Sequence, residues 1–121
     1  MNESEYLPLT EATYYIMLSL LEPIHGYGIM QNVEEISKGR VALGPGTLYG
    51  ALSKLEKEDL ITQVKPSKEV DSRRKYYVLT ETGKTVVKLE YERIRMMTEE
   101  SKRILEKNLE REGGFNICRK K

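Results

Sequence analysis

A helical pattern runs without a proline from Thr80 to about Glu112, and this feature limits most strongly how the chain can fold. Thr80 is suited to cap the start of such a helix, and Gly113 with Gly114 ends it. A helix of ~30 residues is ~45 Å long. That length exceeds what one domain in a chain of 121 residues can cover. Another chain must therefore bury part of its apolar stripe, and we expect a homodimer.

The stripe on this helix follows alternating spacings of four and three, which is typical of a seam between two helices. It passes through Val87, Tyr91, Ile94, Thr98, Ser101 and Leu105. An earlier segment, Ala12 to Leu21, is apolar on nearly every face, so we expect a second chain to cover part of it as well. The predicted dimer interface consists of Tyr15, Leu18, Val87, Tyr91, Ile94, Met97, Ser101 and Leu105.

Three shorter helical patterns precede the long one. The first begins after Thr10, a good N-cap residue, and is predicted to end at Pro23. The second follows the glycine-rich turn at residues 25–28, carries an apolar stripe and is predicted to stop at Gly39. The third opens with Pro45 in its first turn, and its buried side is defined by Leu48, Leu52 and Leu55.

A β-hairpin is predicted after the third helix. Leu60 to Val64 and Arg73 to Leu79 are expected to form its strands, with a polar tip at residues 66–72, and Arg40 to Leu43 is a weak candidate for a further short strand. Three helices followed by a hairpin make a winged helix-turn-helix. The predicted fold is mainly α with a small β-hairpin. It comprises a winged helix-turn-helix domain (1–79), a dimerisation helix (80–112) and a flexible basic tail (113–121).

The composition argues against several classes of function. A single cysteine, Cys118, and a single histidine, His25, exclude an internal disulfide and leave no zinc-type ligand cluster, so we expect no metal or other cofactor. No nucleophile-elbow or phosphate-loop motif occurs, so we expect no enzymatic activity. No apolar run reaches the ~20 residues of a membrane span, and no secretory signal is visible, so we expect a cytoplasmic protein. His25 is expected to cap the turn before the second helix rather than to bind a ligand.

The charge is unevenly distributed although the net charge is only +1. Residues 65–75 carry five basic side chains against two acidic ones, on a segment that includes the predicted hairpin tip. Taken alone, such a run is typical of a solvated loop. Its position directly after the third helix favours the alternative, a wing that contacts DNA phosphates.

The exposed side of the third helix is suited to the major groove of DNA, although an ordinary amphipathic surface helix remains the alternative. Gly46, Thr47 and Gly50 are small enough to let the backbone approach the duplex. Tyr49 is either a half-buried flank of the core or a donor to a phosphate, and we favour the phosphate contact. The predicted DNA-binding residues are Tyr27, Gly46, Thr47, Tyr49, Gly50, Ser53, Lys54, Lys57, Lys65, Lys68, Arg73, Arg74, Lys75 and Tyr76.

Four sequence blocks resemble the PadR-like family of transcriptional regulators. They are His-Gly-Tyr-Gly-Ile from His25, Gly-Pro-Gly-Thr-Leu-Tyr-Gly-Ala-Leu from Gly44, Leu-Glu-Lys-Glu-Asp-Leu-Ile from Leu55, and Arg-Arg-Lys-Tyr-Tyr-Val-Leu-Thr-Glu-Thr-Gly from Arg73. The second and fourth blocks together are highly specific. The resemblance covers roughly residues 10–94, and Asp59 stands where the family often has glycine.

The resemblance implies a homodimeric regulator, usually a repressor, from the subgroup with a single C-terminal dimerisation helix. Its partner would be double-stranded DNA, and twofold symmetry predicts an inverted-repeat operator. Some relatives release DNA when a small aromatic or drug-like effector binds near the first helix, which here implies Tyr14, Met17, Tyr91, Ile94 and Met97. Met96 and Met97 also suit a dimer seam. The alternative function is a winged-helix module that binds a protein rather than a specific DNA sequence.

Overall fold

A computed structural model gives the structure of this chain and describes residues 2–66 and 73–111. Residues 67–72 of the predicted hairpin tip, Lys68 among them, and the predicted tail with Cys118 lie outside the described residues. No helix within the described ranges combines the length and the apolar character that crossing a bilayer requires. The elements, in chain order, are η1 (Glu3–Tyr6), α1 (Glu11–Ser19), β1 (Ile24–His25), α2 (Gly26–Ile36), α3 (Pro45–Lys57), β2 (Ile61–Val64), β3 (Tyr76–Leu79) and α4 (Glu81–Arg111).

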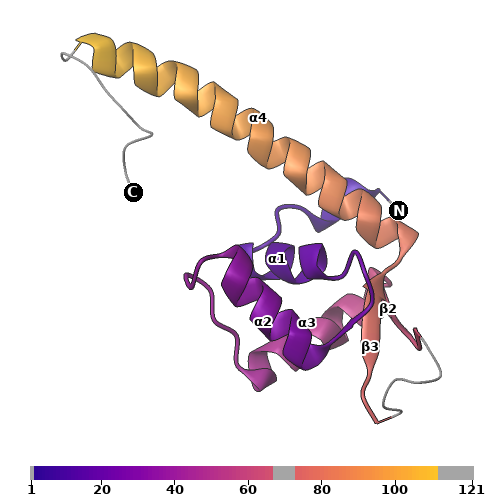
Figure 1. The fold of residues 1–121 in the computed structure, drawn as a ribbon. Coiled ribbons are helices and arrows are strands. Elements are labelled where there is room, and N and C mark those ends of the chain that lie inside the picture. The colour runs from indigo at the N-terminus through magenta and orange to yellow at the C-terminus, as the bar shows by residue number, and fades with distance from the viewer. Residues whose placement is uncertain (1, 67–72, 112–121) are drawn as a thin grey trace. The chain divides into compact units, whose positions relative to one another are not determined.

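The predicted fold class is confirmed, because the chain is mostly helical and carries a small antiparallel sheet. Helices α1, α2 and α3 are grouped beside β2 and β3 (Figure 1). Their shared core contains residues from each of these helices and strands, among them Ile16, Met17, Ile29, Val33, Leu48, Leu52, Ile61 and Leu79. The predicted buried side of α3 is confirmed, since Leu48, Leu52 and Leu55 are all buried.

The helix starts follow the predicted capping residues. Thr10 caps α1, because its Oγ1 accepts a hydrogen bond from the backbone N–H of Thr13 at 3.1 Å. Pro45 occupies the first turn of α3, as predicted. The predicted ends of the first two helices are too late, because α1 ends at Ser19, before Pro23, and α2 ends at Ile36, before Gly39.

The sheet has the order β1–β3–β2, and both pairings are antiparallel. The predicted hairpin is present with shorter strands, and Tyr77 and Leu79 share its buried face. The third strand lies at Ile24–His25, so the prediction of a strand at Arg40–Leu43 was wrong. That segment is held instead by Ser37, whose hydroxyl accepts from the Val41 N–H at 2.9 Å and donates to the Val41 carbonyl at 3.3 Å.

The chain consists of two compact units, which comprise residues 1–90 and the residues from Tyr91 onward. The predicted cap of α4 is confirmed, because the Gly83 N–H donates to Thr80 Oγ1 at 3.0 Å. The first turns of α4 belong to the first unit, whose core includes Val86 and Val87. Glu90 is 1% exposed, and its carboxylate accepts a hydrogen bond from the Leu9 N–H at 3.0 Å. The start of α4 is thereby tied to the segment that leads into α1.

A Gly83→Ala substitution is expected to destabilise the first unit. A Cβ at Gly83 would overlap the carbonyl oxygen of Leu60, which is a backbone atom and cannot rotate away. We expect the free energy of unfolding to fall by about 1–3 kcal/mol, as measured by denaturant titration. Gly46→Ala is the control, because no heavy atom lies within 4 Å of a Cβ there and alanine favours a helix. Equal stability of Gly83→Ala and wild type would contradict this packing.

Candidate nucleic-acid interface

The outer side of α3 is open along its backbone. Gly46 and Gly50 have no heavy atom within 4 Å of the position that a Cβ would occupy. Thr47 and Ser53 are exposed on the same helix, whereas the leucine stripe faces the core. Lys54 and Lys57 are exposed in its second half. The helix therefore offers a surface of small and short polar residues at its start and cations toward its end.

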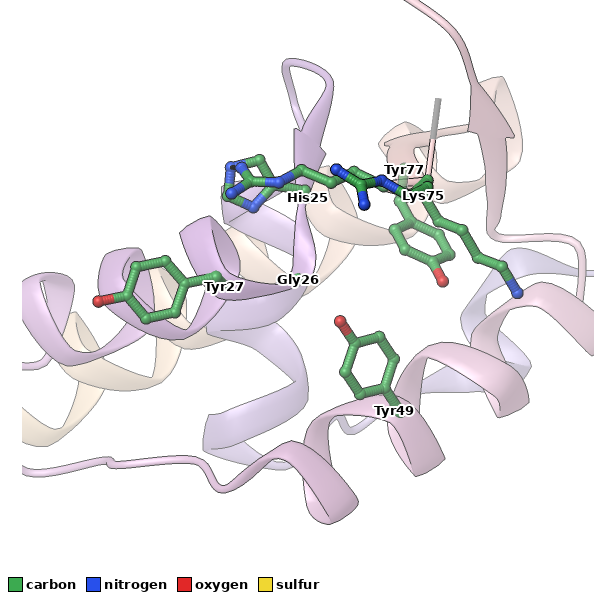
Figure 2. A pocket seen from close by; sticks show the side chains of 8 residues that line it. His25, Gly26, Tyr27, Tyr49, Lys75 and Tyr77 are labelled. Carbon is green, nitrogen blue, oxygen red and sulfur yellow. Dashed lines mark hydrogen bonds between the residues drawn. The ribbon is translucent and has the colours of Figure 1, made fainter. Parts of the chain in front are cut away.

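Beside this helix lies a pocket of about 380 Å³, formed where the start of α2, the middle of α3 and the approach to β3 meet (Figure 2). Three consecutive cations, Arg73, Arg74 and Lys75, line it. The structure thus brings together five of the predicted DNA-binding residues from three segments that are distant in sequence. The pocket is lined by His25, Gly26, Tyr27, Tyr49, Arg73, Arg74, Lys75 and Tyr77.

Tyr49 connects α3 to the start of α2. Its hydroxyl lies so close to Gly26 that a Cβ at Gly26 would overlap it, yet 47% of the tyrosine remains exposed. In Figure 2 its hydroxyl points toward Gly26 at the start of α2. Burial, followed by the nearby Glu56 and Tyr49, raises the pKa of the Tyr77 phenol, so this phenol keeps its proton. The pocket therefore contains the protonated phenol of Tyr77 next to its cations.

His25 caps α2, as predicted, because its Nδ1 accepts a hydrogen bond from the Gly28 N–H at 3.2 Å. Its other ring nitrogen, Nε2, lies 2.8 Å from Nη1 of Arg74. The ring also meets Tyr76 edge-on, with 5.4 Å between the ring centroids. Burial, and secondarily the charge of Arg74, lower the pKa of the imidazole. Sequence reasoning identified the cap and missed the contact with Arg74.

The structure also describes the predicted DNA-binding residues Tyr27, Tyr76 and Lys65. Tyr27 is exposed at the start of α2, and Tyr76 is half-buried because its ring packs on His25. Lys65 is exposed directly after β2. Lys68 lies outside the described residues, so its predicted role is not addressed by the structure.

The predicted dimer and effector residues fall into two groups. In the second unit, Tyr91, Ile94, Met97, Ser101 and Leu105 are all exposed along α4. In the first unit, Val87 and Met17 are 6% and 0% exposed, so both belong to the chain's own core rather than to a free surface. Tyr14, Tyr15 and Leu18 are half-buried, and the Tyr15 hydroxyl accepts a hydrogen bond from Arg40 at 3.1 Å.

Within the second unit, α4 separates apolar from charged side chains. Arg95 forms ion pairs with Glu92 at 2.9 Å and with Glu99 at 3.2 Å. At 100° per residue, this network lies on the opposite side of the helix from Ile94, Ser101 and Leu105. The helix is thus two-faced, with an exposed apolar side.

Comparison with known proteins places this geometry among transcriptional regulators. The sequence pattern of the family described as "Transcriptional regulator PadR-like family" matches residues 16–89. A curated protein from Streptomyces fradiae, described as an uncharacterized 37.1 kDa protein in transposon TN4556, is 35% identical over 81 residues. The alignment covers 66% of this chain and 22% of that protein, so the chain spans about a fifth of the length of this relative.

Solved structures of similar fold carry related descriptions. A PadR family transcription regulator from Clostridium difficile R20291 is 27% identical with a TM-score of 0.61, covering 77% of this chain and 97% of that one. A PadR-like transcription factor from Bacteroides fragilis is 25% identical with a TM-score of 0.59, covering 77% and 87%. A complex structure of RosR-S4, a form of RosR from H. salinarum, is 25% identical with a TM-score of 0.59, covering 86% and 98%.

Proposed function

Because this chain belongs to the PadR-like family of transcriptional regulators, which bind DNA, we propose that it is a dimeric repressor of specific operators. The observation that carries the proposal is the open glycine surface of α3 next to the cationic pocket. The major groove accommodates one α-helix, and an uncovered backbone at Gly46 and Gly50 allows close approach to the bases. Thr47 and Ser53 then offer short hydroxyls to bases or phosphates.

The approach to β3 supplies the phosphate contacts in this proposal. Arg73, Arg74 and Lys75 are exposed and consecutive, and they line the pocket together with the phenols of Tyr27 and Tyr49. Cations and hydroxyls of this kind position a protein on the DNA backbone without reading sequence. Sequence would be read by α3, and the strength of binding would come largely from these phosphate contacts.

A twofold dimer follows from the exposed apolar side of α4 in this proposal. Two copies that bury Tyr91, Ile94, Met97 and Leu105 against each other would present two α3 helices to successive major grooves, ~34 Å apart. The operator would then be an inverted repeat. Binding there would block transcription by occupying the DNA.

Release of the operator is proposed to require a small aromatic or drug-like effector. Such a molecule would bind at the dimer seam, between the two α4 helices, where Tyr91, Ile94 and Met97 supply an aromatic and adaptable apolar surface. Binding would favour a dimer geometry with a different spacing between the two α3 helices, and that state would have lower affinity for the operator.

Sequencing the fragments that the protein retains from a genomic DNA pool would identify the operator.

Replacing Arg73 and Arg74 together by alanine is expected to weaken binding to every duplex by a similar factor. The slope of log affinity against log salt should flatten by about one unit for each phosphate that the variant no longer neutralises, so by about two units. The measurement is a titration of labelled duplex at several salt concentrations.

The matched control is a double alanine variant at Lys102 and Arg103, which removes the same charge from exposed positions on α4. Its salt slope should equal that of the wild type. An unchanged slope in a folded Arg73/Arg74 variant would remove this segment from the DNA interface. Weak binding by the wild type without any salt dependence would instead support the protein-interaction alternative.

A further inference from the structure

The imidazole of His25 faces two hydrogen-bond donors, although a neutral imidazole has only one acceptor nitrogen. The Gly28 N–H points at Nδ1 from 3.2 Å, and the Arg74 guanidinium lies 2.8 Å from Nε2. A guanidinium has no acceptor and stays charged. The ring can therefore satisfy only one of these partners at a time. Protonation would not resolve the conflict, because both ring nitrogens would then be donors facing donors.

Two tautomers of His25 correspond to two arrangements of the site. With the proton on Nδ1, the ring accepts from Arg74 and no longer caps α2. With the proton on Nε2, the ring caps α2 through Gly28 and can no longer accept from Arg74. The exposed guanidinium is then available to water or to another acceptor.

A DNA phosphate would be that acceptor. The pocket beside the pair is open, and Arg73 and Lys75 also line it. A phosphate carries a negative charge that the neutral imidazole lacks, and a guanidinium can bind it through two parallel hydrogen bonds, so a phosphate would outcompete the imidazole for Arg74.

We propose that His25 is a positioning residue, which holds Arg74 beside α2 in the free protein and yields it to a backbone phosphate when DNA binds. This inference rests on the proposed function, and it assigns to His25 a role in binding that a simple helix cap does not have. When Arg74 leaves, the Nε2–H form prevails, so the ring caps α2 at Gly28 without competition and directs a donor into the pocket.

The charges around His25 also predict a pH dependence. Arg74 and Tyr76 meet the ring directly. The pocket that His25 lines also contains Tyr27, Tyr49, Tyr77 and the cations 73–75, and its charged lining residues are all cations. In the free protein, burial and the charge of Arg74 lower the pKa of His25 from its ordinary value. A phosphate that engages Arg74 and approaches the ring would raise this pKa. DNA binding would then be accompanied by proton uptake, and affinity would rise as the pH falls through the interval between the two pKa values.

The single histidine of the chain makes the test direct, because one set of ring signals reports the tautomer. The probe is a random-sequence duplex of ~20 base pairs at low salt, since phosphate contacts do not depend on sequence. Nitrogen NMR of histidine-labelled protein at about pH 8, where the ring is neutral, should show a substantial Nδ1–H fraction in the free protein. The Nε2–H form should dominate when the duplex is bound.

Two variants separate positioning from capping. Arg74→Gln removes the guanidinium, so its free ring should already be in the Nε2–H form, and the duplex should change the tautomer little. Lys102→Gln removes the same charge from an exposed position on α4, outside the proposed DNA interface, and should keep the wild-type response. His25→Asn keeps a capping side chain and should abolish the rise in affinity at low pH, which in the wild type is at most about tenfold per pH unit.

The outcomes distinguish this inference from the proposed function. In one outcome, the wild type binds the duplex with the His25 tautomer of the free protein and with an affinity that depends on pH no more than that of His25→Asn. That result would overturn the positioning role and leave DNA binding standing. If Arg74→Gln responds like the wild type, Arg74 is not the group that His25 holds. If the wild type binds no duplex at all, the proposed function fails and this inference fails with it.

Discussion

A Gly50→Glu variant is expected to fold like the wild type and to bind its operator at least about 10³-fold more weakly, the lower end of the usual gap between specific and non-specific affinity. Gly50 lies on the open side of α3 with no heavy atom within 4 Å of a Cβ, so the fold has room for the new side chain. The major groove of the bound DNA would have no room for it, because the glutamate would meet the bases and the negative phosphates at close range. The measurement is operator binding by a variant whose thermal unfolding matches the wild type.

Gly50→Ala and Gly50→Gln are the matched controls. Alanine should leave stability unchanged or raise it, since it favours a helix over glycine by about 1 kcal/mol. Glutamine has the size of glutamate without the charge, so its affinity should fall between those of the alanine and glutamate variants. Normal operator binding by a folded Gly50→Glu protein would show that this side of α3 does not enter the groove.

The helices were predictable because their signals are local. Thr10 and Thr80 precede apolar periodic segments and cap them through their own hydroxyls, and the leucines of α3 recur at helical spacing. Such signals lie within one or two turns of each other, so one sequence is enough to read them. The same holds for the alternation in β3 that buries Tyr77 and Leu79.

The third strand was not predictable because its partner is remote in sequence. Ile24–His25 has no alternation to detect, and it is a strand only because it pairs with Tyr76 and Tyr77 of β3. The segment Arg40–Leu43 has weak alternation but no strand partner in the described structure, and the side chain of Ser37 bonds its backbone instead. Pairing decided both cases, and pairing is a tertiary property.

The site was predictable in its parts but not in its internal contacts. The lining cations, with Tyr27 and Tyr49, were identified from residue type and position, whereas the approach of Arg74 to His25 spans 49 positions of sequence. The backbone conformation of Asp59 was likewise not predictable from the sequence. Its φ of +64° explains why glycine suits this position after α3, a conformation that no residue pattern revealed.

An Ile94→Glu variant is expected to be monomeric at low micromolar concentration. Ile94 is 38% exposed in one chain, on the apolar side of α4 and opposite the Arg95 ion pairs. In a twofold dimer each substitution occurs twice, so two carboxylates would be buried without partners. Burying each unpaired carboxylate costs about 1–3 kcal/mol. The two together would raise the dissociation constant of the dimer by ~30-fold or more. Solution mass by light scattering or sedimentation measures the outcome, and Leu105→Glu should behave alike.

The variant should also bind its operator only weakly, because a single half-site offers only half of the contacts. Arg103→Glu is the control, since it places the same side chain on the opposite side of the helix, where it stays in water. It should remain dimeric and bind the inverted repeat. A monomeric wild type that binds an inverted repeat tightly would overturn the dimer seam, and with it the release mechanism that depends on the spacing of two α3 helices.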